Sequence, residues 1–280
     1  MSEAPDLSDA PALPGAPALP GAPRAGLPAV VLVTGAAGGM GAAHALALAQ
    51  QGVHVCLADV RDCGPVVEQV RAQGGSASAH ALDVTDPARW AAVVEEIGAA
   101  RGSLGGLVNN AGVSKRVRFM ETTDADWLRI LDINLNGPFY GIKAVAPLMR
   151  DSGGGSIVNI SSIAGQIGYF SPAYSSSKWG LRGLSKSAAG ELAAWQIRVN
   201  SVHPGLVETP LLAGADAFVA SAVASTPAGR TGTTAEVTDA VLFLLSDRST
   251  FMTGSELTLD GGLTSNGTYH RILADTAVLG

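Results

Sequence analysis

The chain has 280 residues, 47% hydrophobic and 15% charged, and a formal net charge of −6 at pH 7. This length suits one large α/β domain or two small ones, and the acidic balance argues against nucleic acid or an anionic membrane surface as a partner. The sequence shows no apolar stretch of membrane-spanning length and no signal-peptide pattern. Cys56 and Cys63 lack the spacing of a metal or redox pair, so we expect no metal site, reduced thiols and a cytoplasmic location.

Residues 1–28 differ in composition from the rest of the chain and carry seven of its 15 prolines. A segment this rich in proline, alanine and glycine buries little apolar surface and sustains neither a helix nor a strand ladder. We therefore expect a disordered tail at 1–28 and a folded domain at 29–280.

From residue 29 onward, short apolar runs alternate with amphipathic stretches. The runs that we expect to form strands are 29–34, 53–59, 76–84, 105–112 with its turn, 156–162, 197–203 and 255–259. The stretches that we expect to form helices are 39–52, 62–73, 87–100, 124–150, 173–194 and about 234–245. Near-continuously apolar strands alternating with helices predict one doubly wound α/β domain with a parallel sheet covered on both faces. The weakly periodic stretch at about 207–230 interrupts the alternation, and we expect it to be a lid over the substrate.

A glycine-rich turn, TGAAGGMG, connects the first strand to the first helix. Gly35, Gly39 and Gly41 permit a tight turn and a close approach of the backbone to a pyrophosphate, which the helix amino terminus would attract. A glycine cluster alone is weak evidence, but its place between a strand and a helix is the one that dinucleotide binding requires.

An acidic residue at the end of the second strand predicts the choice of cofactor. Asp59, with Val60 beside it, stands eighteen residues after Gly41. A carboxylate there binds the adenosine ribose hydroxyls and repels a 2′-phosphate. Arg61 is the only nearby cation, so we expect NAD rather than NADP.

Other strand ends supply further candidates for cofactor binding. Asp83 and Val84 follow the third strand, where a carboxylate can meet the adenine amino group. The fourth strand ends in Asn109-Asn110-Ala111-Gly112, where small residues let the backbone pass the ribose. After the sixth strand the cofactor-binding candidates are Pro204, Gly205, Val207 and Thr209.

Tyr174 and Lys178 form the central catalytic motif that we predict. Positions i and i+4 share one face of a helix, and a neighbouring ammonium lowers the pKa of a tyrosine hydroxyl. Tyr174 could then act as acid and base. Ser162 ends the fifth strand, where its hydroxyl can hold the substrate oxygen; Ser161 is the lesser candidate. Asn134 could reach Lys178 through water and relay protons.

These motifs resemble the short-chain dehydrogenase/reductase family from about residue 29 to about residue 263. The matching parts are the glycine turn, Asp83-Val84, the NNAG motif, Pro204-Gly205, TGSELTLDGG and the tetrad of Asn134, Ser162, Tyr174 and Lys178. Met40 stands where the family more usually has Ile or Leu, and Ser162 lies twelve rather than the usual thirteen residues before the tyrosine. The core segments are most similar to bacterial NAD-dependent 3α/20β-hydroxysteroid dehydrogenases.

The resemblance implies a Rossmann-like domain with a seven-stranded sheet, hydride transfer at a nicotinamide and a homotetramer. It also implies that Tyr174 and Lys178 contact the cofactor, Lys178 through the nicotinamide ribose. The leading functional prediction is an NAD(H)-dependent dehydrogenase of a secondary alcohol, or reductase of its ketone. The alternatives are a 3-oxoacyl-thioester reductase, which Asp59 disfavours, and a non-catalytic nucleotide-binding homologue, which the intact tetrad disfavours.

The segments expected around the substrate are mostly apolar or aromatic, as small-molecule pockets usually are. The candidate substrate contacts are Ser114, Tyr169, Phe170, Leu206 and Leu211. The cations of these segments, Lys115, Arg116, Arg118 and Arg230, are interpreted as solvated loop charges. We therefore expect an uncharged, fairly bulky hydrophobic secondary alcohol or ketone of aryl, alicyclic or steroid type, as a small-molecule substrate.

Overall fold

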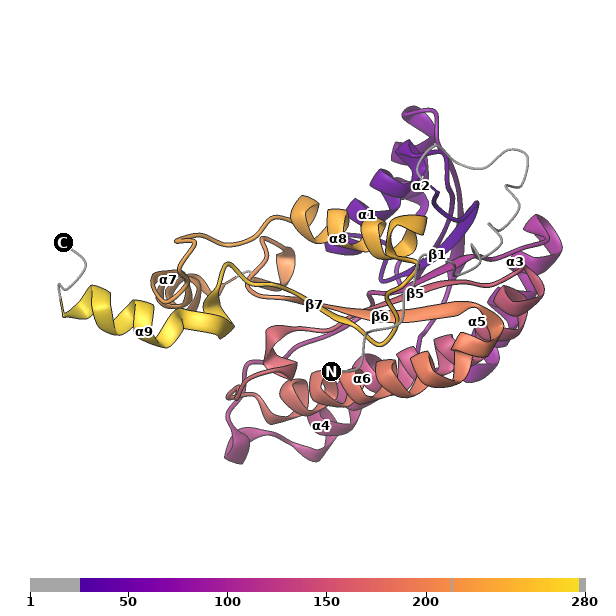
Figure 1. Ribbon diagram of the computed structural model, residues 1–280. Helices are drawn as coiled ribbons and strands as arrows, with labels where there is room; N and C mark the ends of the chain where they lie inside the picture. The colour runs from indigo at the N-terminus through magenta and orange to yellow at the C-terminus, as the bar shows by residue number, and fades with distance from the viewer. Residues whose placement is uncertain (1–25, 213, 277–280) are drawn as a thin grey trace, which may run out of the picture.

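The computed structural model describes residues 26–212 and 214–276, without the side chain of Leu211. Seven parallel strands form one sheet in the order β3-β2-β1-β4-β5-β6-β7, which confirms the predicted fold class (Figure 1). The strands are β1 (Val30–Thr34), β2 (His54–Asp59), β3 (Ser76–Ala81), β4 (Gly106–Asn109), β5 (Gly155–Ile160), β6 (Ile197–Pro204) and β7 (Glu256–Leu259). The strand order reverses direction between β1 and β4, where doubly wound proteins bind ligands.

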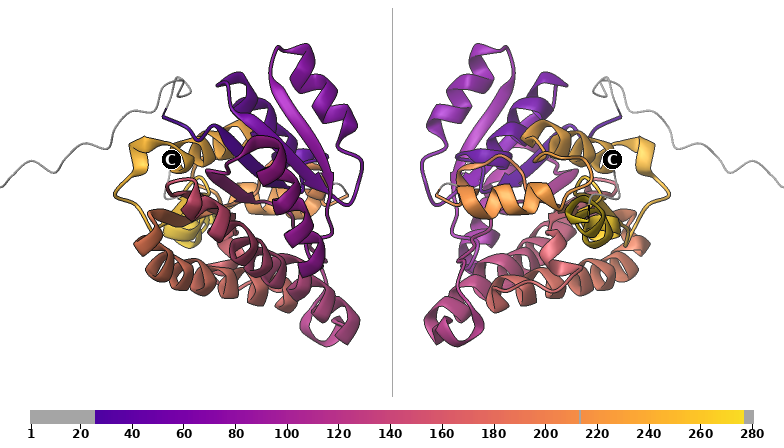
Figure 2. Two further views of the ribbon diagram at one scale, coloured as in Figure 1. Left: turned by 90° about the vertical axis from the view of Figure 1, so that its right-hand side faces the viewer. Right: turned by 90° about the vertical axis from the view of Figure 1, so that its left-hand side faces the viewer.

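Two helical layers cover the sheet, as the apolar strands require (Figures 1 and 2). On one face lie α1 (Gly39–Gln50), α2 (Gly64–Ala72) and α8 (Thr234–Leu245). On the other lie α3 (Pro87–Arg101), α5 (Gly137–Asp151) and α6 (Pro172–Leu192). Short 3₁₀ turns occur at Phe119–Glu121, Ile163–Gly165, Ala193–Trp195, Pro210–Leu212 and Asp247–Ser249. Each helical layer encloses its own apolar core against the sheet, so the carboxyl ends of the strands meet at one rigid edge.

The helix predicted at 124–150 is interrupted. It consists of α4 (Asp124–Leu131), a π-helical stretch at Asp132–Asn136, and α5. Pro138 has no N–H and cannot donate the hydrogen bond that an α-helix would direct to the carbonyl oxygen of Asn134. The π stretch accommodates this position and carries Asn134, which is fully buried.

The segment between β6 and α8 forms the 3₁₀ turn at Pro210–Leu212 and helix α7 (Asp216–Ala224). Helix α9 (Leu263–Asp275) follows β7 and was not predicted from the sequence. Figures 1 and 2 show α7 and α9 together at one end of the molecule, beyond the carboxyl edge of β6.

Residues 26–28, which were expected to belong to the tail, are part of the fold that the structure describes. Leu27 is 4% exposed within the core, and the Gly26 carbonyl oxygen accepts a hydrogen bond from the Asp247 amide at 3.1 Å. The predicted boundary at residue 29 is therefore late, because a single apolar residue among glycines and prolines gave no periodic signal. The rest of the expected tail, at 1–25, lies outside the described residues.

No helix in the described ranges is long and apolar enough to cross a bilayer. The same residues hold no group of three or more histidine, cysteine, aspartate or glutamate side chains arranged for a metal ion.

Two fully buried histidines make stability depend on pH. Burial lowers the pKa of His44 and of His203 from 6.5 to about 4. Between these two pH values the unfolded chain binds protons that the folded chain does not. The contribution of each histidine to the free energy of unfolding is therefore full above pH 6.5 and falls as the pH falls toward 4. Each histidine accounts for about 3 kcal/mol over that window.

We expect urea unfolding to show a declining free energy of unfolding between pH 7 and pH 4.5. In His203→Asn the slope should be shallower, whereas His270→Gln on the outer helix α9 should keep it. A wild-type free energy that stays flat over this range would contradict the assignment.

Candidate active site

A cavity of about 410 Å³ lies at the carboxyl ends of β1, β2 and β4. Its lining includes eleven of the residues predicted to bind the cofactor: Gly35, Gly39, Met40, Asp59, Val60, Asp83, Val84, Asn110, Ala111, Gly112 and Thr209. The lining also includes Arg61, Arg129 and Ile133, of which only Arg61 was considered from the sequence. Predicted residues at or after the ends of five strands, β1, β2, β3, β4 and β6, are thus brought into one groove.

The glycine turn is held in conformations that other residues rarely adopt. Gly35 and Gly39 have φ values of 65° and 56°. Gly41 does not line the groove. A side chain there would collide with the carbonyl group of Gly35, so this glycine allows α1 to pack tightly against the turn. The turn leaves the amino terminus of α1 open to an anion, as pyrophosphate binding requires.

Asp59 is anchored at the rim of the groove. Its carboxylate accepts hydrogen bonds from the amides of Ala37 and Arg61, each at 3.0 Å, and the Arg61 guanidinium lies 3.4 Å away. Asp59 is 7% exposed, whereas the Arg61 side chain is 66% exposed. The buried member of the pair is therefore the anion, and Arg61 extends beside Gly38.

The loop after β4 is tied to β1. The Asn110 side-chain amide donates to the carbonyl oxygens of Thr34 at 2.9 Å and Gly35 at 3.3 Å. The Thr34 hydroxyl accepts from the amides of Asn110 and Ala111. These bonds hold the glycine turn and the NNAG motif as one floor. The glycine cradle, the rim carboxylate and this floor fit a dinucleotide.

A second cavity, of about 400 Å³, adjoins the first and shares Met40 and Thr209 with it. The predicted residues Ser162, Tyr174, Pro204, Gly205, Val207, Ser114, Tyr169, Phe170 and Leu206 line it. Leu211, the remaining predicted substrate contact, has a side chain outside the described residues. Sequence reasoning missed Arg116, Ile167, Ser221, Ala222, Ser225 and Leu263 as lining residues. Arg116 was interpreted as a solvated loop charge; the folded loop turns it into the cavity instead.

Lys178 is buried beneath the second cavity on α6. Its Nζ donates to the carbonyl oxygen of Ile160 at 2.8 Å and lies 5.7 Å from the centroid of the Tyr174 ring. Burial lowers the pKa of Lys178 to about 8. The ammonium group therefore lies below the ring of the tyrosine, on the floor that β5 provides.

Burial dominates the acidity of Tyr174. It raises the pKa of the hydroxyl above 10, and the hydrogen bond from Ser162 lowers it again in part; Tyr169 raises it and Arg116 lowers it further. The expected lowering of this pKa by the Lys178 ammonium stays a prediction. Desolvation of the hydroxyl outweighs the other effects, and the opposing groups are Ser162 and Arg116.

The two serines at the end of β5 differ in their partners. The Ser161 hydroxyl is buried and donates to the backbone carbonyl of Lys178 at 3.2 Å. The Ser162 hydroxyl accepts from the Ala164 amide at 3.2 Å and bonds to Tyr174 in the second cavity. This geometry favours Ser162 over Ser161 as the partner of Tyr174.

Asn134 joins the loop after β4 to α6. Its side chain accepts from the Val113 amide and donates to the Val113 carbonyl, both at 2.9 Å, and donates to the Ser177 hydroxyl at 3.2 Å. A side chain at position 112 would meet both Asn134 Oδ1 and Lys178 Nζ, at 3.3 and 3.7 Å. Gly112 thus keeps the space between these two tetrad members open.

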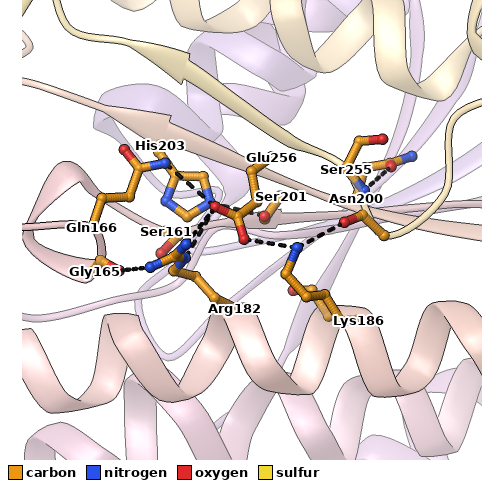
Figure 3. Close-up of polar contacts among 12 residues, drawn as sticks. Ser161, Gly165, Gln166, Arg182, Lys186, Asn200, Ser201, His203, Ser255 and Glu256 are labelled. Carbon is orange, nitrogen blue, oxygen red and sulfur yellow. Dashed lines mark hydrogen bonds and ion pairs between the residues drawn. The ribbon is translucent and has the colours of Figure 1, made fainter. Parts of the chain in front are cut away.

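A network of buried and half-buried polar groups supports the turn that carries Ser162 (Figure 3). His203 Nδ1 donates to the Ser162 carbonyl oxygen at 3.2 Å, because a carbonyl can only accept. Arg182 donates to the Gly165 carbonyl oxygen at 2.7 Å and pairs with Glu256 at 2.9 Å. Glu256 also pairs with Lys186 at 2.9 Å, so the first residue of β7 supports the turn that follows Ser162.

Comparison with known proteins identifies the class. A family model described as "Enoyl-(Acyl carrier protein) reductase" matches residues 35–264. The chain is 43% identical over 245 residues to trans-4-hydroxycyclohexanecarboxylate dehydrogenase of Sinomonas cyclohexanicum, covering 84% of this chain and 93% of that protein. It is 43% identical over 235 residues to 3-alpha-(or 20-beta)-hydroxysteroid dehydrogenase of Mycobacterium tuberculosis, covering 83% and 88%.

Among solved structures, a short-chain type dehydrogenase/reductase from Mycobacterium marinum superposes with a TM-score of 0.83 at 33% identity, covering 86% of this chain and 97% of that one. The chain belongs to the short-chain dehydrogenase/reductase family of oxidoreductases, whose dehydrogenases bind a nicotinamide cofactor.

Proposed function

We propose that this protein is an NAD(H)-dependent dehydrogenase that interconverts a hydrophobic, ring-bearing secondary alcohol and its ketone. The observation that carries the proposal is that Tyr174 and Ser162 line a cavity that shares Met40 and Thr209 with the glycine-lined groove. Similarity to enzymes named for a hydroxycyclohexanecarboxylate and for hydroxysteroids supports a ring-bearing substrate, as do the aromatic walls of the cavity.

Different residues of the two cavities would bind different parts of the cofactor. The glycine turn would hold the pyrophosphate, Asp59 the adenosine ribose, Asp83 and Val84 the adenine, and the residues from Pro204 to Thr209 the nicotinamide end. When bound, the nicotinamide supplies the hydride acceptor in oxidation and the hydride donor in reduction.

The tetrad handles the substrate oxygen and its proton. Ser162 holds the oxygen beside Tyr174 Oη, which takes the hydroxyl proton in oxidation and returns it in reduction. Lys178 fixes the tyrosine ring from below and would bind the nicotinamide ribose. Asn134, bonded to Ser177 next to Lys178, is placed to continue a proton relay through water.

The two other predicted functions are less well supported. A 3-oxoacyl-thioester reductase would draw on NADPH, whose 2′-phosphate Asp59 would repel. A non-catalytic nucleotide-binding protein has no need of a tyrosine that faces a substrate-sized cavity. Turnover of secondary alcohols with NAD distinguishes the three.

The first test removes the transferable proton. Tyr174→Phe keeps the aromatic ring in place, so NADH binding should be retained while kcat falls by about 10²–10⁴-fold. Steady-state kinetics and fluorescence titration with NADH measure the two effects, with Tyr140→Phe on α5 as the matched control. Substantial activity in Tyr174→Phe would assign the acid–base role elsewhere.

The second test concerns cofactor choice. Wild-type kcat/KM should be far higher with NAD(H) than with NADP(H), and Asp59→Ala should narrow that ratio because the repelling carboxylate is gone. Asp62→Ala, which removes an exposed carboxylate of the same loop, is the control. Comparable wild-type efficiency with both cofactors would refute the choice of NAD.

A third test concerns assembly. The inner faces of α4, α5 and α6 carry the buried Ile130, Ile142, Leu181 and Leu192, whereas Trp127, Phe139 and Trp179 remain 36–48% exposed on the same helices. Such an apolar surface suits a subunit interface. We expect a homotetramer in multi-angle light scattering at micromolar concentration, and a monomer there would contradict this expectation.

A further inference from the structure

Two arginine side chains, Arg61 and Arg129, line the glycine-lined groove. Arg61 pairs with Asp59 at 3.4 Å. The Arg129 side chain, in the last turn of α4, is exposed and makes no ion pair or hydrogen bond within residues 26–212 and 214–276. An exposed arginine needs no partner in water, so its place in the groove decides whether it can meet a ligand.

One row of residues leads from the floor of the groove to its mouth. Arg129, Ile133 and Gly137 follow one another at four-residue spacing along α4, the π stretch and α5, and side chains at this spacing lie above one another on a helix. A side chain at Gly137 would collide with Val84 at 2.9 Å, so this end of the row packs directly on the strand end. Gly137 is buried, Ile133 is half-buried and Arg129 is exposed, and the last two line the groove.

The contact with Val84 places this row at the adenosine end of the groove. Val84 is proposed above to bind the adenine, whereas Met40 and Thr209 mark the end that adjoins the catalytic cavity. An adenine base held between Val84 and Ile133 would therefore have Arg129 as its neighbour toward solvent.

A planar guanidinium suits the face of such a base. It is weakly hydrated and stacks on aromatic rings, and an adenine offers an uncharged π face on which side chains stack. The charged part of the dinucleotide, the pyrophosphate, is proposed to lie at the glycine turn, where the amino terminus of α1 compensates its charge. The base is thus the part of the cofactor that Arg129 is placed to meet.

We propose that Arg129 stacks on the adenine base of the dinucleotide and covers it from solvent. This inference rests on the proposed function and adds a cofactor contact to it. Arg129 lies apart from the tetrad, so its removal should weaken cofactor binding and leave kcat at saturating cofactor unchanged.

The experiment is a titration of the purified protein with three ligands. NADH carries the base and the pyrophosphate, adenosine carries the base without phosphate, and reduced nicotinamide mononucleotide carries a phosphate without the base. Arg129→Ala should raise the Kd for NADH and for adenosine by about 3–30-fold, the range of a cation–π contact, and leave the Kd for the mononucleotide unchanged. Arg129→Lys should recover only part of the loss, because an ammonium group has no planar face. Arg118→Ala, which removes an equal charge from an exposed residue outside the lining of the groove, should bind all three ligands as wild type does.

Several outcomes would overturn the stacking of Arg129 on the base. A loss with NADH but not with adenosine would place Arg129 on the pyrophosphate, and an equal loss with all three ligands would mean a general effect of charge or of folding. Unchanged NADH binding in Arg129→Ala, full recovery in Arg129→Lys, or no adenosine binding to wild type would also refute it. Failure of the proposed function is seen separately: a wild type that binds adenosine through Arg129 but prefers NADPH, or oxidises no ring alcohol, would refute that function and keep this inference.

Discussion

The burial of one ammonium group constrains the rest of the site. Lys178 is 5% exposed, and its Nζ donates to the carbonyl oxygen at the end of β5. A buried cation is costly unless polar groups compensate it, and the lowered pKa of Lys178, about 8, reflects that cost. Three residues surround this group. The Tyr174 ring lies above it, Gly112 lies beside it, and Asn134 lies across the gap that Gly112 leaves open.

A network of polar side chains next to Lys178 holds the backbone of the site in place. His203 and Arg182 bind the backbone carbonyls of the turn at Ser162–Gly165, so the turn cannot relax away from α6. Glu256 joins Arg182 and Lys186 to the last strand of the sheet. Burial and its ion pairs act oppositely on this carboxylate, and the ion pairs prevail, lowering the pKa of Glu256 to about 2. The turn at Ser162–Gly165 is therefore supported from three elements, α6, β6 and β7.

Much of this architecture was predictable from local patterns. The apolar runs of β1, β2, β4, β5 and β6 predicted strands that are buried on both faces, whereas β3 and β7 at the two edges of the sheet are partly exposed. The spacing of Tyr174 and Lys178 placed both on one helical face, and the glycine turn identified the groove. These patterns are local, so they can be recognised in the sequence without knowledge of the tertiary structure.

Some of the missed features have a local cause, and others depend on the folding of loops or on burial. The π stretch around Asn134 reflects Pro138, whose effect on a long amphipathic pattern was not anticipated. Of the residues of helix α9 only Gly267 is buried, so this helix has no face committed to the core of the domain. Arg116 is separated by one residue from the exposed Arg118, and only the folded loop distinguishes the two. The raised pKa of Tyr174 likewise comes from its burial, which the YxxxK spacing does not report.

The central claim is that this site moves a hydride between a ring carbinol and a nicotinamide. The most direct measurement uses cyclohexanol carrying deuterium at the carbinol carbon, incubated with the purified protein and NAD, followed by mass spectrometry of the reduced cofactor. The account predicts that one deuterium appears on the nicotinamide ring as the ketone forms. Ketone formation without deuterium in the cofactor would contradict it.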